Sequence, residues 1–466
     1  MLVMVCLCAV AVITNARAQA PPFARVPTVT KVEPPNWWAA HTINPVRLLV
    51  RGANLHGARV TATRPGIVPS AVVINGAGTY LFVSVTITTT AQPGNYPLAV
   101  ETPAGKTTIP FRLEASLDPK QNFQGMTTDD VIYLIMPDRF ANGDPSNDYP
   151  ADAPRAATDR QNQRAWHGGD LRGIINRLPY LKELGVTALW LNPWYDNWNG
   201  LKTCDKPWCP TTYYHGYHAI DYYGVEDRFG DLATLRELVA KAHALGLKVI
   251  QDQVANHIGI HHPWVKDPPL DNWFHPRRVS RPFRAELLLS PHAGATARRA
   301  MLDTWFTDDL PDLNQEEPEV ARYEIQNALW WIGVTGLDGI RQDTIQFLPR
   351  FFIRDLSVAL HRQYPKMWMV GEVFNRDPVH VSFFMGGRAG WDGIETDLDS
   401  VFDFPLWQTS LEVFTNKKPV SALRDLLKYD ALYPDPSRLT TMVNNHDVSR
   451  FLSLAGGTPE GAMLHT

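Results

Sequence analysis

Short apolar segments alternate with longer helical patterns from residue 131 onward. We predict seven strands among them: Val131–Met136, Val186–Leu191, Leu247–Ala255, Leu337–Asp343, Met367–Val373, Asp397–Phe404 and Thr440–Asn444. Strands that alternate with helices form a parallel sheet. The pattern therefore predicts an α/β fold, a (β/α)₈ TIM barrel, over residues 125–466. Few residues follow the seventh strand, so we expect a barrel that is truncated before strand 8 or closed by another segment.

Residues 29–115 show a different pattern, in which turn signals such as Asn75-Gly76 separate short β-rich runs. The predicted strands are Val46–Val50, Ala71–Ile74, Leu81–Thr88, Tyr96–Val100 and Thr107–Leu113. Regularly spaced short strands are typical of a β-sandwich, here of the immunoglobulin-like type. No catalytic cluster stands out in this region.

A long segment, residues 258–319, lies between the third predicted barrel strand and the helix that follows it. It is too long for an ordinary connection between a strand and a helix. We therefore expect a small excursion domain over the mouth of the barrel.

The N-terminus resembles a secretory signal peptide over residues 1–18. Residues 2–13 are almost wholly apolar, and Ala16-Arg17-Ala18 fits the small-residue cleavage pattern, although no Lys or Arg precedes the apolar run. The run is too short to form a spanning helix. We expect a periplasmic or secreted protein that has no membrane segment once the signal is removed.

Export affects the interpretation of the cysteines. Cys6 and Cys8 leave with the signal, whereas Cys204 and Cys209 remain. In an oxidising compartment the remaining pair is expected to close a small loop as a disulfide. Two free thiols are the alternative, and two thiols without nearby partners make a poor zinc site.

Charge and aromatic content narrow the class of ligand. The net charge of −4 gives no field that would attract nucleic acid or an anionic membrane. Ten aromatic residues lie between positions 190 and 223. Sugar rings present flat C–H faces that stack on aromatic rings, so this density favours a carbohydrate. Packing beneath a loop is the alternative for about half of them.

Carboxylates lie at the ends of the fourth and fifth predicted strands. Gly339, Arg341 and Asp343 share one face of their strand, so the guanidinium should keep Asp343 ionised, as a nucleophile requires. Glu372 follows an apolar run, and desolvation should raise its pKa as a general acid requires. A structural ion pair and a solvent-exposed glutamate are the respective alternatives.

The third and seventh strands end in similar groups. Asp252 and Asn256-His257 end the third, and Asn445-His446-Asp447 end the seventh. Active sites of this fold are built from the C-terminal ends of the strands. Two carboxyl groups are what glycoside hydrolysis needs, and a third, Asp447, would hold sugar hydroxyls.

A cluster of short oxygen-bearing side chains occupies residues 142–148, and Gly168-Gly169-Asp170 follows it. Such side chains suit a hard cation such as Ca²⁺, although the spacing is not that of an EF-hand. A solvated turn is the alternative.

These motifs resemble glycoside hydrolase family 13, the α-amylase family. The four signature regions occur in order, as Asp252 to His257, Gly339 to Asp343, Gly371 to Phe374, and Asn445 to Asp447, with Leu310 to Asn314 as an additional region. The resemblance implies that Asp343 is the nucleophile, Glu372 the acid/base and Asp447 the transition-state stabiliser. It also implies the substrate-binding residues His215, Asp252, His257, Arg341 and His446.

Within that family, Val32 to Trp38 resembles the N-terminal domain of cyclomaltodextrinases and neopullulanases, which often helps to form dimers. Tyr133 to Asp144 is similar to the start of their barrel, including a calcium loop. The resemblance implies a homodimer through the N-terminal domain. The Ca²⁺ ligands that it implies are Asn142, Asn147, Gly168, Asp144, Asp148 and Asp170. Gln253 departs from the small or apolar residues that are commoner at its position.

The leading hypothesis is a retaining hydrolase of α-1,4 bonds in cyclodextrins and maltooligosaccharides. One alternative is another specificity of the same machinery, such as pullulan cleavage, exo-action or transglycosylation. Another is a glucan-binding protein without catalysis, which predicts the loss of at least one of the three acids. A third is a purely structural fragment.

Overall fold

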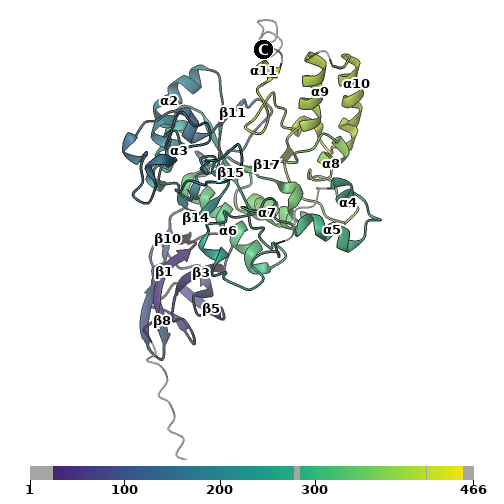
Figure 1. The fold of residues 1–466 in the computed structure, drawn as a ribbon. Coiled ribbons are helices and arrows are strands. Elements are labelled where there is room, and N and C mark those ends of the chain that lie inside the picture. Colours follow the sequence, from purple (N-terminus) through teal and green to yellow (C-terminus); the bar gives the residue numbers. More distant parts are fainter. Residues whose placement is uncertain (1–24, 278–283, 416, 455–466) are drawn as a thin grey trace, which may run out of the picture.

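The computed structural model describes residues 25–277, 284–415 and 417–454 (Figure 1). The predicted signal peptide, residues 1–18, lies outside this part of the chain. Among the described residues, no helix combines the length and the apolar character that crossing a membrane requires.

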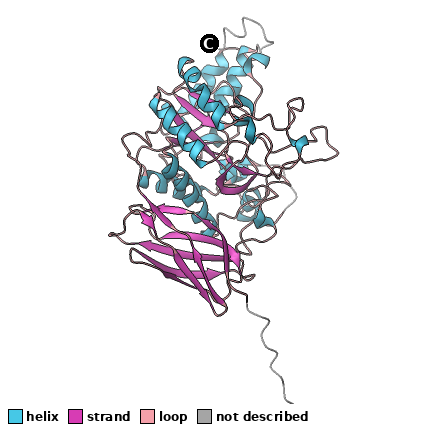
Figure 2. Ribbon diagram, turned by 90° about the vertical axis from the view of Figure 1, so that its left-hand side faces the viewer, coloured by secondary structure: helices cyan, strands magenta, loops and turns pink. Residues whose placement is uncertain are grey.

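The N-terminal part consists of ten strands, which Figure 2 shows as a group of arrows at one end of the molecule. The strands are β1 Thr28–Glu33, β2 Asn36–Trp38, β3 Val46–Ala53, β4 Arg59–Ala62, β5 Ile67–Ile74, β6 Tyr80–Ile87, β7 Gly94–Asn95, β8 Leu98–Thr102, β9 Gly105–Ile109 and β10 Arg112–Glu114. They form three sheets, in the orders β1-β3-β6-β5, β4-β8-β9 and β2-β10-β7. The sequence did not predict β1, β2, β4 and β7, which are short or carry charged side chains.

The N-terminal strands pack against helix α6, Pro318–Thr335. The Arg47 guanidinium pairs with the Glu319 carboxylate at 2.8 Å, and the Gln326 amide exchanges two hydrogen bonds with the Arg47 backbone. The Trp330 indole N–H donates to Asn36 at 2.9 Å. Paired polar groups buried between the two parts fix this helix, which leads directly into a strand of the larger sheet.

The larger sheet is parallel throughout, in the order β11-β12-β15-β16-β17-β18. Its strands are β11 Ile132–Ile135, β12 Ala188–Leu191, β15 Lys248–Gln253, β16 Gly339–Gln342, β17 Trp368–Gly371 and β18 Ser400–Val401. A separate pair, β13 Tyr195–Asn197 and β14 Ala219–Val225, lies in the loop after β12.

Helices follow the strands of the parallel sheet, as the alternating pattern predicts. The helices other than α6 are α1 Pro137–Phe140, α2 Leu171–Glu183, α3 Leu232–Ala244, α4 Ala285–Leu289, α5 Ala295–Leu302, α7 Arg350–Gln363, α8 Pro378–Ser382, α9 Phe404–Phe414, α10 Ser421–Leu427 and α11 Phe451–Leu454. Asp170 and Asp231 cap α2 and α3 by accepting a backbone N–H three residues on.

The prediction of a strand over residues 440–444 is wrong. In this segment only Thr440 pairs, through a single parallel bridge with Phe402. The neighbouring strand β18 has just two residues, so it offers almost no ladder along which a further strand could extend.

The free edge of β11 and the segment around Thr440 face each other across a cavity of about 1690 Å³. Apolar side chains from the inner face of the sheet line it, among them Leu134, Trp190 and Met442. Within the described residues, the parallel strands thus form a curved sheet without an eighth strand.

Most of the predicted excursion, residues 258–319, is irregular. It contains the one-turn helix η3 Pro263–Val265 and the short helices α4 and α5, which lie beside α8 and α7 in Figure 1. Two isolated bridges, His257 to Asp312 and Phe274 to Leu313, fasten its two ends to each other. Asp312 and the end of β15 are thereby held together.

Candidate active site

Three adjacent strands bring the predicted acids together. Asp252 lies in β15 and is in register with Arg341 of β16. Asp343 and Glu372 directly follow β16 and β17, and their backbone N–H groups donate to the carbonyls of Gln253 and Gln342, the last residues of the preceding strands. The ladder therefore continues to the acids themselves and fixes where their side chains begin.

Arg341 connects all three carboxylates. Its Nη1 lies 2.7 Å from Asp252 Oδ1 and 2.7 Å from Asp343 Oδ1, and its Nη2 lies 3.0 Å from Glu372 Oε2. All four side chains are buried, with Asp343 5% and Glu372 4% exposed. A buried guanidinium needs anionic partners, and here it holds three acids around one centre.

Two of the carboxyl groups around Arg341 have raised pKa values. Burial raises the pKa of Glu372 to about 8, against the opposing effect of Arg341, and the charges of Asp343 and Asp447 add to the rise. Burial likewise raises the pKa of Asp252 to about 7. Glu372 therefore carries a proton at neutral pH, as the sequence-based argument from desolvation predicts.

Thr344 contacts both central acids, a role that the sequence did not reveal. Its backbone N–H donates to Glu372 Oε2 at 2.9 Å, and its hydroxyl donates to Asp343 Oδ2 at 3.0 Å. Its φ of 46° lies in the left-handed region, which a β-branched residue rarely adopts. Such a conformation is set by the surrounding fold, so no sequence pattern could have predicted these contacts.

Two further aromatic residues belong to the site. The Tyr217 hydroxyl donates to Asp252 Oδ2 at 2.8 Å and lies 2.9 Å from His446 Nε2. The Trp190 indole N–H donates to the same Asp252 oxygen at 2.8 Å. Sequence reasoning counted both only as part of an aromatic-rich region. The position of Tyr217, two residues after His215, was the available signal.

The three predicted histidines surround the acids as neutral imidazoles. Burial lowers the pKa of His215 to about 4 and of His446 to about 4, and it lowers the pKa of His257 as well. His257 Nε2 is buried and has no hydrogen-bond partner among the described residues. These rings are thus available for hydrogen bonds with a neutral polar ligand.

Asp447 is the least enclosed of the predicted acids. Its side chain is 41% exposed, and its Oδ2 lies 3.3 Å from His446 Nε2. Its charge nevertheless contributes to the raised pKa of Glu372. Asp447 is therefore coupled to Glu372 electrostatically but is more exposed than Asp343 and Glu372.

Two of the predicted Ca²⁺ ligands near residues 142–148, Asp144 and Asp170, accept hydrogen bonds from the protein itself. Asp170 accepts three backbone N–H groups, from Gly143, Asp144 and Gly173, and so fastens the loop to the start of α2. The Asp144 side chain accepts from Ser146 and caps a short helical turn, η1 Pro145–Asn147. Among the described residues, no group of three or more His, Cys, Asp and Glu side chains is arranged to hold a metal.

Three of the other implied ligands, Asn142, Asp148 and Gly168, lie together. The Oδ1 atoms of Asn142 and Asn147 are buried and accept no hydrogen bond within the described residues. The Asn142 amide donates to Asp148 Oδ1 at 2.8 Å. A Cβ at Gly168, where φ is 82°, would lie 2.4 Å from the same Asp148 oxygen, so only glycine fits there. Unpaired amide oxygens beside a carboxylate are ligands that suit Ca²⁺.

Comparisons with known proteins identify the family of both parts of the chain. Residues 134–464 match the family description "Alpha amylase, catalytic domain", and residues 31–117 match "Cyclomaltodextrinase, N-terminal". The chain belongs to the α-amylase family. The resemblance that the four motifs indicated is thereby confirmed for both parts of the chain.

Curated relatives in this family include Neopullulanase 2 of Thermoactinomyces vulgaris, which is 32% identical over 70% of this chain and 51% of its own length. Cyclomaltodextrinase of Geobacillus thermopakistaniensis is 29% identical over 71% of this chain and 51% of its own. Beta/alpha-amylase of Paenibacillus polymyxa is 34% identical over 70% of this chain and 25% of its own. The chain thus spans a quarter to about half the length of these relatives.

Solved structures of the α-amylase family are similar as well. An α-amylase from Anoxybacillus is 36% identical with a TM-score of 0.58, and it covers 71% of this chain and 64% of its own. The cyclomaltodextrin glucanotransferase CldA is 29% identical with a TM-score of 0.60, and it covers 70% of this chain and 66% of its own.

Proposed function

We propose that the protein is a retaining glycoside hydrolase that cleaves α-1,4-glucosidic bonds of cyclodextrins and maltooligosaccharides. One observation carries the proposal: a buried guanidinium holds two neighbouring carboxyl groups, Asp343 and Glu372, of which Glu372 is protonated at neutral pH. A nucleophile and an acid side by side are what this reaction requires.

In the proposed mechanism, Asp343 attacks the anomeric carbon while Glu372 donates its proton to the departing glycosidic oxygen. The product is a covalent glycosyl-enzyme, and Glu372 is left as a carboxylate. The Glu372 carboxylate then takes a proton from a water molecule. The water oxygen attacks the same anomeric carbon, and the bond to Asp343 breaks. Arg341 pairs with Asp343 at 2.7 Å, and Thr344 orients both acids.

The remaining polar groups are proposed to bind the sugar next to the cleaved bond. Asp447 and His446 would hold its hydroxyls and favour the distorted ring of the transition state. His215 and His257 would donate or accept as neutral imidazoles, and the Tyr217 ring offers a stacking surface. Asp252 would act mainly through Arg341 and Tyr217, because its oxygens accept from both.

Transfer instead of hydrolysis is the second candidate function. Relatives named cyclomaltodextrin glucanotransferase support it, since the same covalent intermediate can react with a sugar hydroxyl. Pullulan cleavage is a third specificity, which the relative named neopullulanase supports. Binding without catalysis is disfavoured because all three acids are present.

Calcium is proposed at the loop of residues 142–148. The unpaired Asn142 and Asn147 oxygens support it, together with the nearby Asp148 carboxylate and the backbone at Gly168. Asp144 and Asp170 complete the set that the family resemblance implies. A bound Ca²⁺ would stabilise the loop that follows β11.

The wider organisation is also part of the proposal. The parallel sheet is taken as part of a (β/α)₈ barrel over residues 125–466, with 258–319 as its inserted excursion. The N-terminal strands, residues 29–115, are taken as an immunoglobulin-like sandwich that supports a homodimer. Residues 1–18 are proposed as a signal peptide that directs the protein to the periplasm or outside the cell.

Product analysis tests the function. The protein is incubated with β-cyclodextrin, pullulan and starch, and the products are separated by chromatography, with Asp343→Asn as the inactive control. We expect linear maltooligosaccharides from β-cyclodextrin, released first as the α-anomer by NMR. Release of the β-anomer would refute the retaining mechanism, and cyclic or lengthened products would establish transfer.

A further inference from the structure

A small loop closed by a disulfide carries an exposed tryptophan. Cys204 and Cys209 are bonded, with their Cα atoms 5.5 Å apart, so the expected disulfide is present. Trp208 lies inside this loop and is 46% exposed, more than any other tryptophan among the described residues. The exposed indole makes Trp208 a candidate contact surface.

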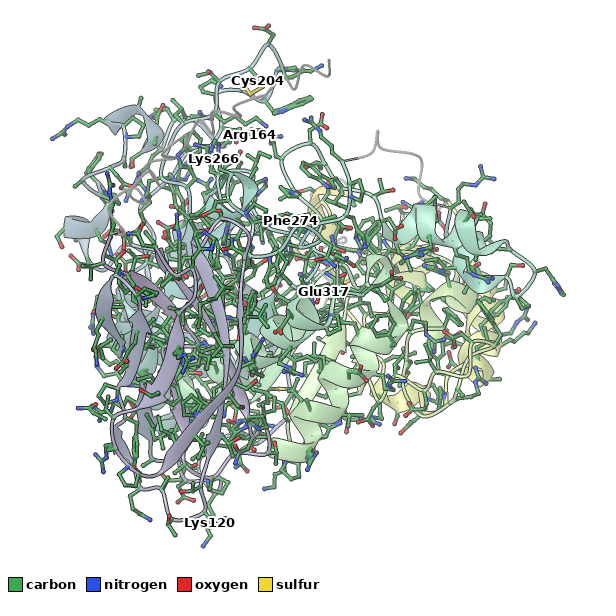
Figure 3. The ribbon with its side chains drawn as sticks, turned by 90° about the horizontal axis from the view of Figure 1, so that it is seen from below. Lys120, Arg164, Cys204, Lys266, Phe274 and Glu317 are labelled. Carbon is green, nitrogen blue, oxygen red and sulfur yellow. A yellow bond between two sulfur atoms is a disulfide. The ribbon has the colours of Figure 1, made fainter. Side chains whose placement is uncertain are left out.

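The stem of the disulfide loop is fixed on three sides. Lys202 and Thr211 exchange backbone hydrogen bonds of 2.9 and 3.0 Å across it. The Lys202 ammonium pairs with Asp309 of the excursion, and Thr212 N–H donates to the Arg164 carbonyl at 2.8 Å. Figure 3 shows Cys204 at the periphery of the molecule with Arg164 beside it. The position of Trp208 is therefore set by the fold and by the disulfide.

A row of aromatic rings leads from this stem to the acids. Tyr213, two residues beyond Thr211, stacks on His218 at 3.9 Å and meets the edge of His215 at 6.4 Å. His215 in turn stacks on Tyr217 at 5.7 Å, and Tyr217 contacts Asp252. The stem of the loop is thus connected to the candidate active site through a continuous series of packed rings.

A second pair of rings adjoins this series near the stem. Trp198 stacks on His261 at 3.8 Å and lies 6.0 Å from Tyr213. His261 is exposed, and Trp198 is half-buried. The exposed His261 ring and the half-buried Trp198 ring form one aromatic cluster with Tyr213 next to the stem, and rings that are partly open to solvent are suited to the C–H faces of glucose units.

We propose that Trp208 forms an outer subsite for α-1,4-glucan, where its indole stacks on a glucose unit several residues away from the cleaved bond. This inference rests on the proposed function and names a longer substrate for the same site. Because the disulfide already restricts the loop, little further conformational entropy is lost when a sugar binds. The subsite therefore favours long chains over short ones.

Chain-length kinetics test the subsite. The parent protein, Trp208→Ala and Trp208→Phe are compared with maltotriose and maltoheptaose as substrates. For Trp208→Ala we expect KM for maltoheptaose to rise about fivefold, as the loss of one stacking contact predicts. KM for maltotriose and kcat for both should stay unchanged, and Trp208→Phe should recover most of the affinity. An equal KM change for both substrates, or none, would overturn the subsite.

Two controls separate this role from others. Trp391→Phe alters the other exposed tryptophan, which lies beside α4, and should change neither KM. The pair Cys204→Ser and Cys209→Ser should raise KM for maltoheptaose about two- to threefold without changing KM for maltotriose. If Trp208→Ala instead shifts the sedimentation of the protein from dimer to monomer, the loop is a contact between copies and the proposal fails.

A binding measurement distinguishes failure of the subsite from failure of the proposed function. Maltoheptaose is titrated calorimetrically into Asp343→Asn and into Asp343→Asn combined with Trp208→Ala. Weaker binding to the double variant supports the subsite even if the parent protein cleaves no glucan. Equal affinities would overturn the subsite while leaving hydrolysis by the parent protein intact.

Discussion

Two parts of the candidate site are built in contrasting ways. The acids at Asp252, Asp343 and Glu372 follow adjacent strands with continuous ladders, are buried, and share the Arg341 guanidinium. Asp447 follows a segment with one bridge, and its side chain is 41% exposed. The difference shows that an acid buried at the end of a strand ladder affects the stability of the fold as well as the chemistry of the site.

The physical reason is the cost of burying charge. A guanidinium that is taken out of water needs compensating partners, so removal of an acid beside Arg341 leaves its buried charge less well compensated. Asp447 keeps much of its hydration and needs no such partner. The comparison therefore predicts that substitutions in the first part affect stability or catalysis strongly, whereas substitution of Asp447 affects catalysis alone.

The largest effect is expected for the proposed nucleophile. Asp343→Asn removes the carboxylate that attacks the sugar, so kcat should fall about 10³-fold or more. Binding of maltooligosaccharide should survive, because the neighbouring imidazoles and aromatic rings remain. Activity is measured by release of reducing ends, and binding by calorimetry. Retained turnover in this variant would refute the assignment of Asp343.

The next prediction compares the two parts directly. Asp252→Asn leaves Arg341 with fewer anions and should lower the free energy of unfolding by about 3 kcal/mol. Asp447→Asn should change it by less than about 0.5 kcal/mol, as for an exposed site. Urea unfolding followed by circular dichroism gives both values. Equal losses of stability would remove the distinction between the two parts.

The pH dependence sharpens the comparison at Glu372. Its raised pKa keeps the general acid protonated at neutral pH, so activity is present below about pH 8 and is lost as the pH rises through that value. Above it, kcat/KM should fall about tenfold per pH unit. Asp447→Asn removes a nearby negative charge and should move this alkaline limb to lower pH. A limb that stays in place would show that Asp447 lies too far away to act.

The smallest effect concerns the loop of residues 142–148, which lies outside both parts. If Ca²⁺ binds there, a chelator should lower Tm by about 3 °C without altering kcat, because a ligand of the native state is lost. Asn147→Ala should lower Tm by a similar amount and make the protein insensitive to the chelator. If a chelator shifts neither variant nor parent, the loop is a plain turn.

Sequence reasoning predicted the main strands of the parallel sheet well. Six of the seven predicted strands are present, and four of them, β12, β15, β16 and β17, are apolar runs that follow a long helix. The seventh, residues 440–444, has the right composition but lacks a partner of sufficient length in β18. Pairing is a property of two segments, and one segment's residues cannot specify it.

The candidate site was predicted through its strand ends. Asp343, Glu372 and Asp252 were found because a charge after an apolar strand is visible in one dimension. Thr344 was not, since its contacts depend on a left-handed backbone that the neighbouring strands impose. Tyr217 was seen as one aromatic residue among many, and only its hydrogen bond to Asp252 distinguishes it.

The sequence by itself determined the alternation of strands and helices, the family and the chemical identity of the acids, because apolar periodicity and residue type are local properties. The tertiary structure alone decided that one guanidinium joins three acids, that Thr344 contacts two of them, and that Asp447 stays partly in water. Those properties depend on distance and solvent access, which arise only when strands far apart in sequence lie side by side.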